Sequence, residues 1–212
     1  RKKLTPTYQL GCKRVLLSNN YYEALAAPNA GVETSGVAEV REHSIVTNGG
    51  EEIEVDAIIY GTGFKATDPF AEISIRGRGG RDLNEVWTEL GGAEAYYGIT
   101  TAGFPNFYML LGPNTGLGSN SIILMIEAQA HYTMQALGLM EKDRLAALEL
   151  KPEVQAKFNS DLQQEIGHTV WATGCNSWYI SESGKNTTIW PGLTMSYRQQ
   201  TRDLDPADFF FF

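Results

Sequence analysis

Two glycine-rich turns have the composition of a ligand-binding site. Each follows an apolar run that predicts a buried strand: residues 55–59 precede the tripeptide GTG at 61–63, and residues 107–111 precede GPNTGLGSNS at 112–121. Glycine lets the backbone approach a ligand closely at the carboxyl edge of a parallel sheet. The second turn also leads into a helix, whose free N–H groups and dipole favour an anion. A flavin or a dinucleotide phosphate would suit this place, although an ordinary tight turn has the same pattern.

A pair of adjacent cations, Lys13 and Arg14, stands out because the chain has a formal net charge of −8. Only residues 1–14 are locally basic. An isolated basic pair is most often a solvated surface corner, so the pair alone predicts no site. The overall acidity argues against a nucleic-acid partner or an anionic membrane surface, because either would need clustered Lys and Arg.

The elements that would position these residues are short strands and helices, which predicts an α/β fold. The sequence Asn48-Gly49 favours a hairpin turn that leads into an alternating edge strand, GluGluIleGluVal. The helix after residue 121 is apolar nearly all round for two turns, so we expect it to be buried, with Asn120 or Ser121 as its N-cap. Further strands are expected at 15–17, 32–34, 37–40 and 44–47, and further helices at 21–25, at 83–90 and from Pro152 to Gly167.

The cysteines and histidines give no sign of a metal site. Cys12 and Cys175 lie far apart and form no CxxC, so we expect neither a zinc knuckle nor a disulfide framework, and a reducing, cytoplasmic location fits best. The three histidines lack metal-type spacing, so no metal is expected. The segment from residue 169 carries three of the four tryptophans among many Gly, Ser and Asn residues. It predicts an ordered irregular loop, where binding residues concentrate.

Taken together, these segments resemble the C-terminal half of a flavin-dependent Baeyer-Villiger monooxygenase, within the wider class of flavin-containing monooxygenases. The matching segments appear in the family's order: LTPTYQLGCKRVLLSNNYYEAL at 4–25, DAIIYGTGF at 56–64, TTAGFPNFYMLLGPNTGLGSNS at 100–121, and SWY at 177–179 with a later WPG and Tyr197. No GxGxxG follows a strand in these 212 residues, and the family's FxGxxxHxxxW is absent. The resemblance therefore covers the half that completes two domains started elsewhere.

The resemblance implies the fold and the domain organisation. The chain would be the C-terminal portion of a flavoprotein with two dinucleotide-binding, Rossmann-like domains, built as a three-layer arrangement of sheet and helices. Residues 1–50 would end the NADPH-binding domain and supply linking strands. Residues 51–168 would complete the FAD-binding domain, and residues 169–212 would form an irregular cofactor or substrate loop and tail. The N-terminal half of the parent protein is the partner that this organisation implies.

The resemblance also implies roles for individual residues. Arg14 matches the family's catalytic arginine, which stabilises the flavin peroxide anion and holds the nicotinamide, and Lys13 matches the lysine that pairs with the 2′-phosphate. These roles agree with the physics of the two side chains, a five-donor guanidinium for an anion and a point charge for a phosphate. Trp178 matches a tryptophan on a mobile loop that contacts NADP(H) through its indole N–H. The other implied cofactor-binding residues lie in the two turns: Thr62, Gly63, Gly112, Asn114, Ser119, Asn120 and Ser121.

The function implied for the parent protein is an FAD- and NADPH-dependent oxygenation of a small ketone. NADPH would reduce the flavin, O2 would add to give a flavin peroxide, and this nucleophile would attack the ketone to yield an ester or lactone. One alternative is oxygenation at nitrogen or sulfur by the same flavin chemistry. Another is that the 212 residues are a non-catalytic folding unit, and we expect them to be inactive on their own.

Overall fold

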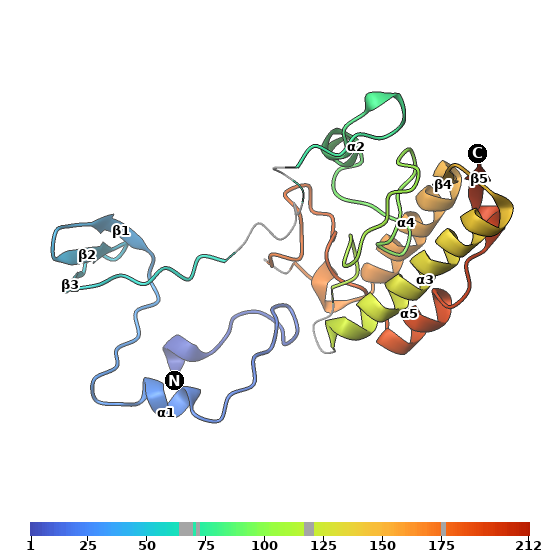
Figure 1. Ribbon diagram of the computed structural model, residues 1–212. Helices are drawn as coiled ribbons and strands as arrows, with labels where there is room; N and C mark the ends of the chain where they lie inside the picture. The colour runs from blue at the N-terminus through green and yellow to red at the C-terminus, as the bar shows by residue number, and fades with distance from the viewer. Residues whose placement is uncertain (64–69, 71–72, 117–120, 175–176) are drawn as a thin grey trace. The chain divides into compact units, whose positions relative to one another are not determined.

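The computed structural model describes residues 1–63, 70, 73–116, 121–174 and 177–212. The chain divides into two compact units, one made of residues 1–8 and 15–64 and the other of residues 9–14 and 65–212. Figure 1 identifies the elements of each unit along the chain. The three-part domain division expected from the resemblance stays a prediction.

The first unit is built around a small antiparallel sheet. Its strands are β1 (Val37–Val40), β2 (Ser44–Thr47) and β3 (Glu52–Glu54), in the order β1-β2-β3. The turn between β2 and β3 places Gly50 at a φ of 81°, a left-handed conformation that glycine adopts without strain. The same unit contains the 3-10 helix η1 (Lys2–Leu4) and the helix α1 (Tyr21–Leu25). These findings confirm the predicted hairpin, its edge strand and the short helix.

Three strand predictions in the first unit are wrong. Residues 15–17, 32–34 and 55–59 form no strand in the structure. The third of these runs has the composition of a strand that is buried on both faces, yet Ile59 is 95% exposed. A buried strand needs neighbours that take up its backbone N–H and C=O groups. Within the described residues the run has no β-bridge partner, and only its first residue is bonded to a neighbouring segment, through the Val55 N–H, which donates to the His43 carbonyl at 3.0 Å.

In the residues that the structure describes, the second unit contains four α-helices and a two-stranded sheet. Figure 1 shows α3 and α5, which contact each other, lying side by side. The C-terminal residues form β5 (Phe209–Phe211), which pairs antiparallel with β4 (Leu148–Leu150). The helices are α2 (Leu83–Glu89), α3 (Ile122–Asp143), α4 (Pro152–Ile166) and α5 (Thr194–Gln200), and the 3-10 helices are η2 (Arg78–Gly80), η3 (Val170–Ala172) and η4 (Pro206–Asp208).

Local signals mark where three of these helices begin and where one of them ends. The Asp82 carboxylate accepts a hydrogen bond from the backbone N–H of Asn84 at the start of α2. Pro152 occupies the first turn of α4, and Gly167 is its C-cap, as predicted. Ser121 is the N-cap residue of α3. The expectation that the first turns of α3 are buried is wrong in part, because Ile123 is 56% exposed and the helix buries one stripe that includes Met125.

Two apolar clusters join these elements into one core. The first packs α3 against β4 and β5, and the second packs α3 against α4 and α5. Each fully buried large side chain contributes about 1.5–3 kcal/mol relative to an exposed one. The buried members of the first cluster are Ile99, Tyr132, Ala136, Leu148, Leu150 and Phe209, and those of the second are Met125, Ala128, Leu162, Ile166, Trp190 and Tyr197.

Two features of the second unit differ from the sequence-based expectations. Residues 107–111 form no strand; the N–H groups of Met109 and Leu111 donate instead to the Ile99 carbonyl at 2.7 Å and to Gln129 Oε1 at 2.9 Å. Cys12 is disulfide-bonded, although the spacing of the cysteines predicted no such cross-link, and Cys175 lies outside the described residues. The cytoplasmic location inferred from the cysteines stays a prediction.

No helix in the described part of the chain is long and apolar enough to cross a membrane. Within the same ranges, no group of three or more His, Cys, Asp or Glu residues is arranged to hold a metal ion.

Candidate functional site

A cavity of about 470 Å³ in the second unit brings three of the predicted site residues together. These are Arg14, Ser121 and Trp178, which come from three distant parts of the sequence. The volume falls within the roughly 300–1,000 Å³ typical of small-ligand sites. The other described residues that line the cavity are Gly116, Ile122, Tyr179 and Ile189.

Arg14 reaches this cavity because the segment of residues 9–14 is held against η3. The Trp171 indole Nε1 donates to the Gly11 carbonyl at 3.1 Å, and Thr173 Oγ1 donates to Gln9 Oε1 at 3.2 Å. Gly11 has a φ of 90°, and the side chain of the next residue, Cys12, is buried. The backbone that carries the guanidinium is therefore fixed from both sides of Gly11.

Tyr179 forms an apolar, uncharged wall beside the arginine. Its side chain is 2% exposed, and its ring centroid lies 4.4 Å from that of Trp178 and 6.2 Å from that of Trp171. Burial raises the pKa of the Tyr179 phenol above its usual value, while the nearby charge of Arg14 lowers it. Since burial is the larger effect, the phenol stays protonated at neutral pH, and Arg14 supplies the positive charge of this wall.

The start of α3 adds a second source of positive potential. Ser121 and Ile122, the N-cap and the first residue of a 22-residue helix, both line the cavity. The free N–H groups at such an end carry a partial positive charge that favours an anion or an electron-rich heteroatom. Together with the Arg14 guanidinium, this end makes the cavity suited to a ligand that is anionic or rich in lone pairs.

Gly116 is required for the shape of another part of the cavity wall. Its N–H donates to the Thr188 carbonyl at 2.8 Å, and its carbonyl accepts from the Trp190 N–H at 2.9 Å. A Cβ at this position would lie 2.8 Å from the Thr188 carbonyl oxygen, closer than side-chain carbons approach backbone. Glycine therefore lets residues 186–190 lie directly against the turn, which places Ile189 in the wall.

Two other predicted residues of the same turn have structural contacts. The amide nitrogen of Asn114, which is 3% exposed, donates to the carbonyls of Asn186 at 2.8 Å and Ile189 at 3.2 Å. Gly112 lies against Gly98, where a Cβ would come within 2.3 Å of the Gly98 carbonyl oxygen. Neither residue is in the cavity lining. A direct cofactor contact by Asn114 or Gly112 stays a prediction.

The remaining predicted residues are not brought to the cavity by the described structure. Lys13 is exposed next to Arg14. Thr62 and Gly63 belong to the first unit, and Ser119 and Asn120 lie outside the described residues. The wall residues Tyr179 and Ile189 were not named from the sequence. Tyr179 could have been found, since it is the third residue of the SWY motif, whereas no local signal marks Ile189.

No family model matches the chain. Among curated proteins it is 51% identical to a Baeyer-Villiger monooxygenase of Pseudomonas aeruginosa over 209 residues, which cover 98% of the chain and 39% of that protein. It is 49% identical to a Baeyer-Villiger monooxygenase of Streptomyces coelicolor, covering 99% of the chain and 40% of that protein. A further relative, the FAD-binding monooxygenase ktnD of Aspergillus niger, is 37% identical over 97% of the chain and 34% of its own length.

Solved structures give the same result. The chain superimposes on cyclohexanone monooxygenase from Rhodococcus sp. Phi1 bound to NADP+ with a TM-score of 0.85 at 30% identity, covering 99% of the chain and 40% of that structure. It also superimposes on OTEMO in complex with FAD and NADP with a TM-score of 0.87 at 26% identity, with the same coverage. The chain thus spans between 34% and 40% of the length of the relatives and solved structures named above. By sequence and by fold, the chain is the C-terminal part of a member of the Baeyer-Villiger monooxygenase family.

Proposed function

We propose that the chain is the part of an FAD- and NADPH-dependent monooxygenase that supplies the arginine, the helix end and the tryptophan of its cofactor site. The observation that carries this proposal is the single cavity lined by Arg14, Ser121 and Trp178. The relatives named above are monooxygenases, and the matched structures contain NADP or FAD with NADP. The reaction we propose for the complete protein is insertion of one oxygen atom from O2 into a ketone, giving an ester or lactone.

The residues of the cavity fit part of such a cofactor. The flavin, reduced by NADPH, would supply the oxygen-transfer chemistry in this site. A flavin or nicotinamide ring presents carbonyl and nitrogen lone pairs, for which the Arg14 donors and the N–H groups at the start of α3 are suited. Trp178, 52% exposed, offers an aromatic face and an indole N–H donor to a ring of this kind.

Each residue then has a distinct role. Arg14 would hold negative charge that develops at the reacting oxygen, because its guanidinium stays charged and presents several donors. Lys13 would contact the 2′-phosphate and thus select NADPH over NADH. Trp178 would hold the nicotinamide part of the cofactor against the cavity.

The proposal includes an N-terminal part of the protein as the partner of this chain. No GxGxxG motif occurs in the 212 residues, and the relatives are about two and a half times as long as the matched region. The phosphate-binding loops for FAD and NADPH would therefore come from that part. We expect the 212 residues alone to bind added FAD weakly and to oxidise no NADPH.

The test uses the complete protein that contains this chain. With NADPH, O2 and a cyclic ketone, we expect a lactone, detected by mass spectrometry. Arg14→Met should lower kcat/KM by about 100-fold or more, the range seen when a donor to a developing oxyanion is removed. Arg198→Met, which removes an exposed arginine on α5, is the matched control and should leave the rate unchanged.

Three outcomes would contradict the proposal in different ways. If the complete protein oxygenates only the nitrogen of an amine or the sulfur of a thioether, and no ketone, the alternative reaction would be supported instead of ketone oxygenation. A complete protein that takes up FAD but oxidises no NADPH would contradict the proposed monooxygenase activity. Full activity of the Arg14→Met variant would refute the role of this arginine.

A further inference from the structure

A short hairpin follows Trp178 and Tyr179 directly. Ile180 and Asn186 form an antiparallel bridge, and the Ser181 N–H donates to the Lys185 carbonyl at 2.8 Å. The turn is closed by the Gly184 N–H, which donates to the Ser181 carbonyl at 2.9 Å. We call residues 180–186 the loop hairpin. Because Trp178 and Tyr179 directly precede the loop hairpin, its position also fixes the position of their backbone.

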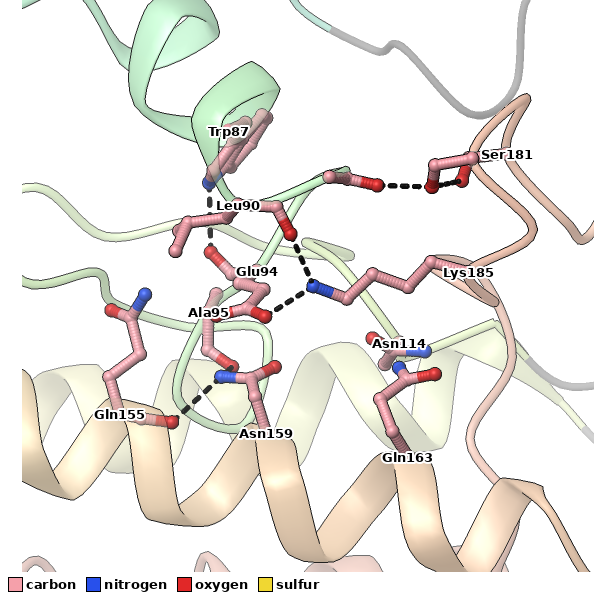
Figure 2. A network of polar contacts seen from close by, with 12 residues as sticks. Trp87, Leu90, Glu94, Ala95, Asn114, Gln155, Asn159, Gln163, Ser181 and Lys185 are labelled. Carbon is pink, nitrogen blue, oxygen red and sulfur yellow. Dashed lines mark hydrogen bonds and ion pairs between the residues drawn. The ribbon is translucent and has the colours of Figure 1, made fainter.

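A partly buried ion pair holds the loop hairpin to the turn after α2. Lys185 Nζ contacts the Glu94 carboxylate and donates to the Leu90 carbonyl at 3.1 Å. Figure 2 shows the lysine reaching from the hairpin to both groups. The side chains of Lys185 and Glu94 are 16% and 13% exposed. A second contact, from Ser183 Oγ to the Gly91 carbonyl, joins the same two segments.

Glu94 is anchored from the other side. Its own carbonyl accepts a hydrogen bond from the indole Nε1 of Trp87 at 2.9 Å, and Trp87 is 4% exposed on α2. The carbonyl of the next residue, Ala95, accepts from Asn159 of α4 at 3.4 Å, as Figure 2 also shows. Lys185 is therefore paired with a carboxylate whose backbone is attached to two helices.

The other contacts of the loop hairpin are at its base. The Asn186 carbonyl accepts from Gln163 Nε2 and from Asn114 Nδ2, both at 2.8 Å. These bonds fix the end of the hairpin but leave its tip, residues 181–185, to the contacts with residues 90–94. Trp178 is half exposed, and its ring packs on that of Tyr179, the residue that directly precedes the loop hairpin.

From these contacts we propose that Lys185 and Glu94 are a positioning pair: they hold the loop hairpin so that Trp178 and Tyr179 stand in the wall of the Arg14 cavity. The proposal rests on the proposed function, since it names the nicotinamide cofactor as the ligand that this wall receives. When the pair is broken, the hairpin detaches from residues 90–94 and the wall is formed in only a fraction of molecules. The apparent affinity for NADPH falls by that fraction.

The chemistry of the pair predicts which variants matter. Removing one partner leaves the other charge buried and uncompensated, whereas exchanging the two charges keeps the pair. Lys185→Met and Glu94→Gln should therefore release the hairpin, and the double exchange Lys185→Glu with Glu94→Lys should restore it. Lys157→Met is the matched control, because it breaks the ion pair with Asp161 on the exposed face of α4.

The first measurement does not depend on any activity. Protease Glu-C cuts after Glu182, an exposed residue at the tip of the hairpin, and the fragments are identified by mass spectrometry. We expect this cut to be about tenfold faster in Lys185→Met than in the parent, since cleavage follows the population of the open loop. Lys157→Met and the double exchange should be cut at the parent rate. An unchanged rate in Lys185→Met and Glu94→Gln would overturn the proposal.

The second measurement separates positioning from general stability in the complete protein. We expect Lys185→Met to raise KM for NADPH about tenfold while kcat at saturating NADPH stays within about twofold. If Lys185→Met does not fold, Glu94→Gln, which removes the other charge of the pair, carries the same comparison, with the double exchange as the variant that should restore the parent KM. A faster Glu-C cut with an unchanged KM would refute the positioning role. A parent protein without monooxygenase activity would contradict the proposed function, while the Glu-C rates would still decide whether the pair holds the hairpin.

Discussion

The indole Nε1 of Trp171 donates a hydrogen bond to the Gly11 carbonyl oxygen, 3.1 Å away and 160 positions earlier in the chain. Three residues after Gly11, Arg14 lines the cavity. The bond thus connects η3 to the backbone that carries Arg14. Both segments belong to the second unit, so the site depends on this contact between the first residues and the last third of the chain.

Trp171→Phe should weaken the site without changing its charges. The variant removes the donor to Gly11, which costs about 1 kcal/mol of stability and loosens residues 9–14. We expect weaker NADP+ binding by the complete protein, measured by fluorescence titration. Trp190→Phe is the control: its Nε1 has no partner among the described residues, and it is absent from the cavity lining. Equal losses of affinity in the two variants would show that packing, not the Gly11 bond, is responsible.

Arg14→Met should raise the pKa of Tyr179. Burial already raises this pKa, and the charge of Arg14 is the opposing effect that lowers it. Removing the charge leaves burial alone, so the phenol should ionise at higher pH than in the parent. The measurement is a pH titration of ¹³C-labelled tyrosine by NMR. A Tyr179 pKa that is unchanged or lower in the variant would mean that the guanidinium does not act on the phenol.

The Glu33 carboxylate should titrate far below the usual range. It accepts hydrogen bonds from the backbone N–H and the hydroxyl of Ser35, at 2.7 and 2.8 Å, and from Lys3 Nζ at 3.1 Å. Led by the Ser35 backbone bond, these contacts lower its pKa from 4.5 to about 2. Because the folded pKa is depressed, the stabilisation is present above about pH 4.5 and is lost as the pH falls toward 2.

A carboxylate NMR titration of Glu33 checks this window. Ser35→Ala removes the hydroxyl donor and should move the midpoint upward, while the backbone bond remains. Thr34→Ala is the control, since Thr34 contributes to Glu33 through its backbone N–H. A midpoint near the ordinary glutamate value in the parent would contradict the hydrogen bonding described.

The elements predicted well from the sequence are those that local signals decide. The turn at residues 48–50 needs only the backbone preferences of Asn and Gly, and α4 is delimited by Pro152 and Gly167. The runs at 55–59 and 107–111 have strand composition, but a strand exists only with a pairing neighbour, which sequence composition does not supply. The helix α5 was missed because it is seven residues long and its buried side chains include Thr194, so no apolar period marks it.

The candidate site shows the same division between local and long-range information. The resemblance named Arg14, Ser121 and Trp178, and the structure places them around one cavity. The resemblance did not indicate that the Asn114 amide donates to carbonyls 72 and 75 positions away. These bonds depend on how the loop that carries the two carbonyls is folded. The pairing of Lys185 with Glu94 spans 91 positions and is equally invisible in the sequence.

Gly98→Ala should destabilise the chain more than Gly103→Ala. Both glycines have positive φ values, 65° and 84°, so alanine is strained at either position. At Gly98, however, a Cβ would lie 2.2 Å from Thr115 Cγ2 and 2.7 Å from the Pro113 carbonyl oxygen, whereas at Gly103 nothing lies within 4 Å. We expect the clash to add about 2 kcal/mol or more to the free-energy loss, measured by urea unfolding. Equal losses of unfolding free energy in the two variants would mean that residues 112–116 can move away from a side chain at position 98.

Tyr197→Phe and Tyr132→Phe should differ although both side chains are fully buried. The Tyr197 hydroxyl donates to the Tyr97 carbonyl at 2.6 Å and accepts from Gln129 Nε2 at 3.0 Å. Phenylalanine would leave that carbonyl and that amide without this partner in a dry core, which costs about 1–3 kcal/mol. The Tyr132 hydroxyl has no hydrogen-bond partner among the described residues.

Removing the Tyr132 hydroxyl should therefore be neutral or stabilising in this chain, because an unpaired buried hydroxyl carries a desolvation cost that phenylalanine lacks. Thermal or urea unfolding of the two variants measures the difference, and each serves as the control for the other because the change in side-chain volume is the same. A Tyr132→Phe variant that loses as much stability as Tyr197→Phe would show that the Tyr132 hydroxyl is bonded in solution. Equal, negligible effects would show that the bonds from Tyr197 to Tyr97 and Gln129 contribute nothing.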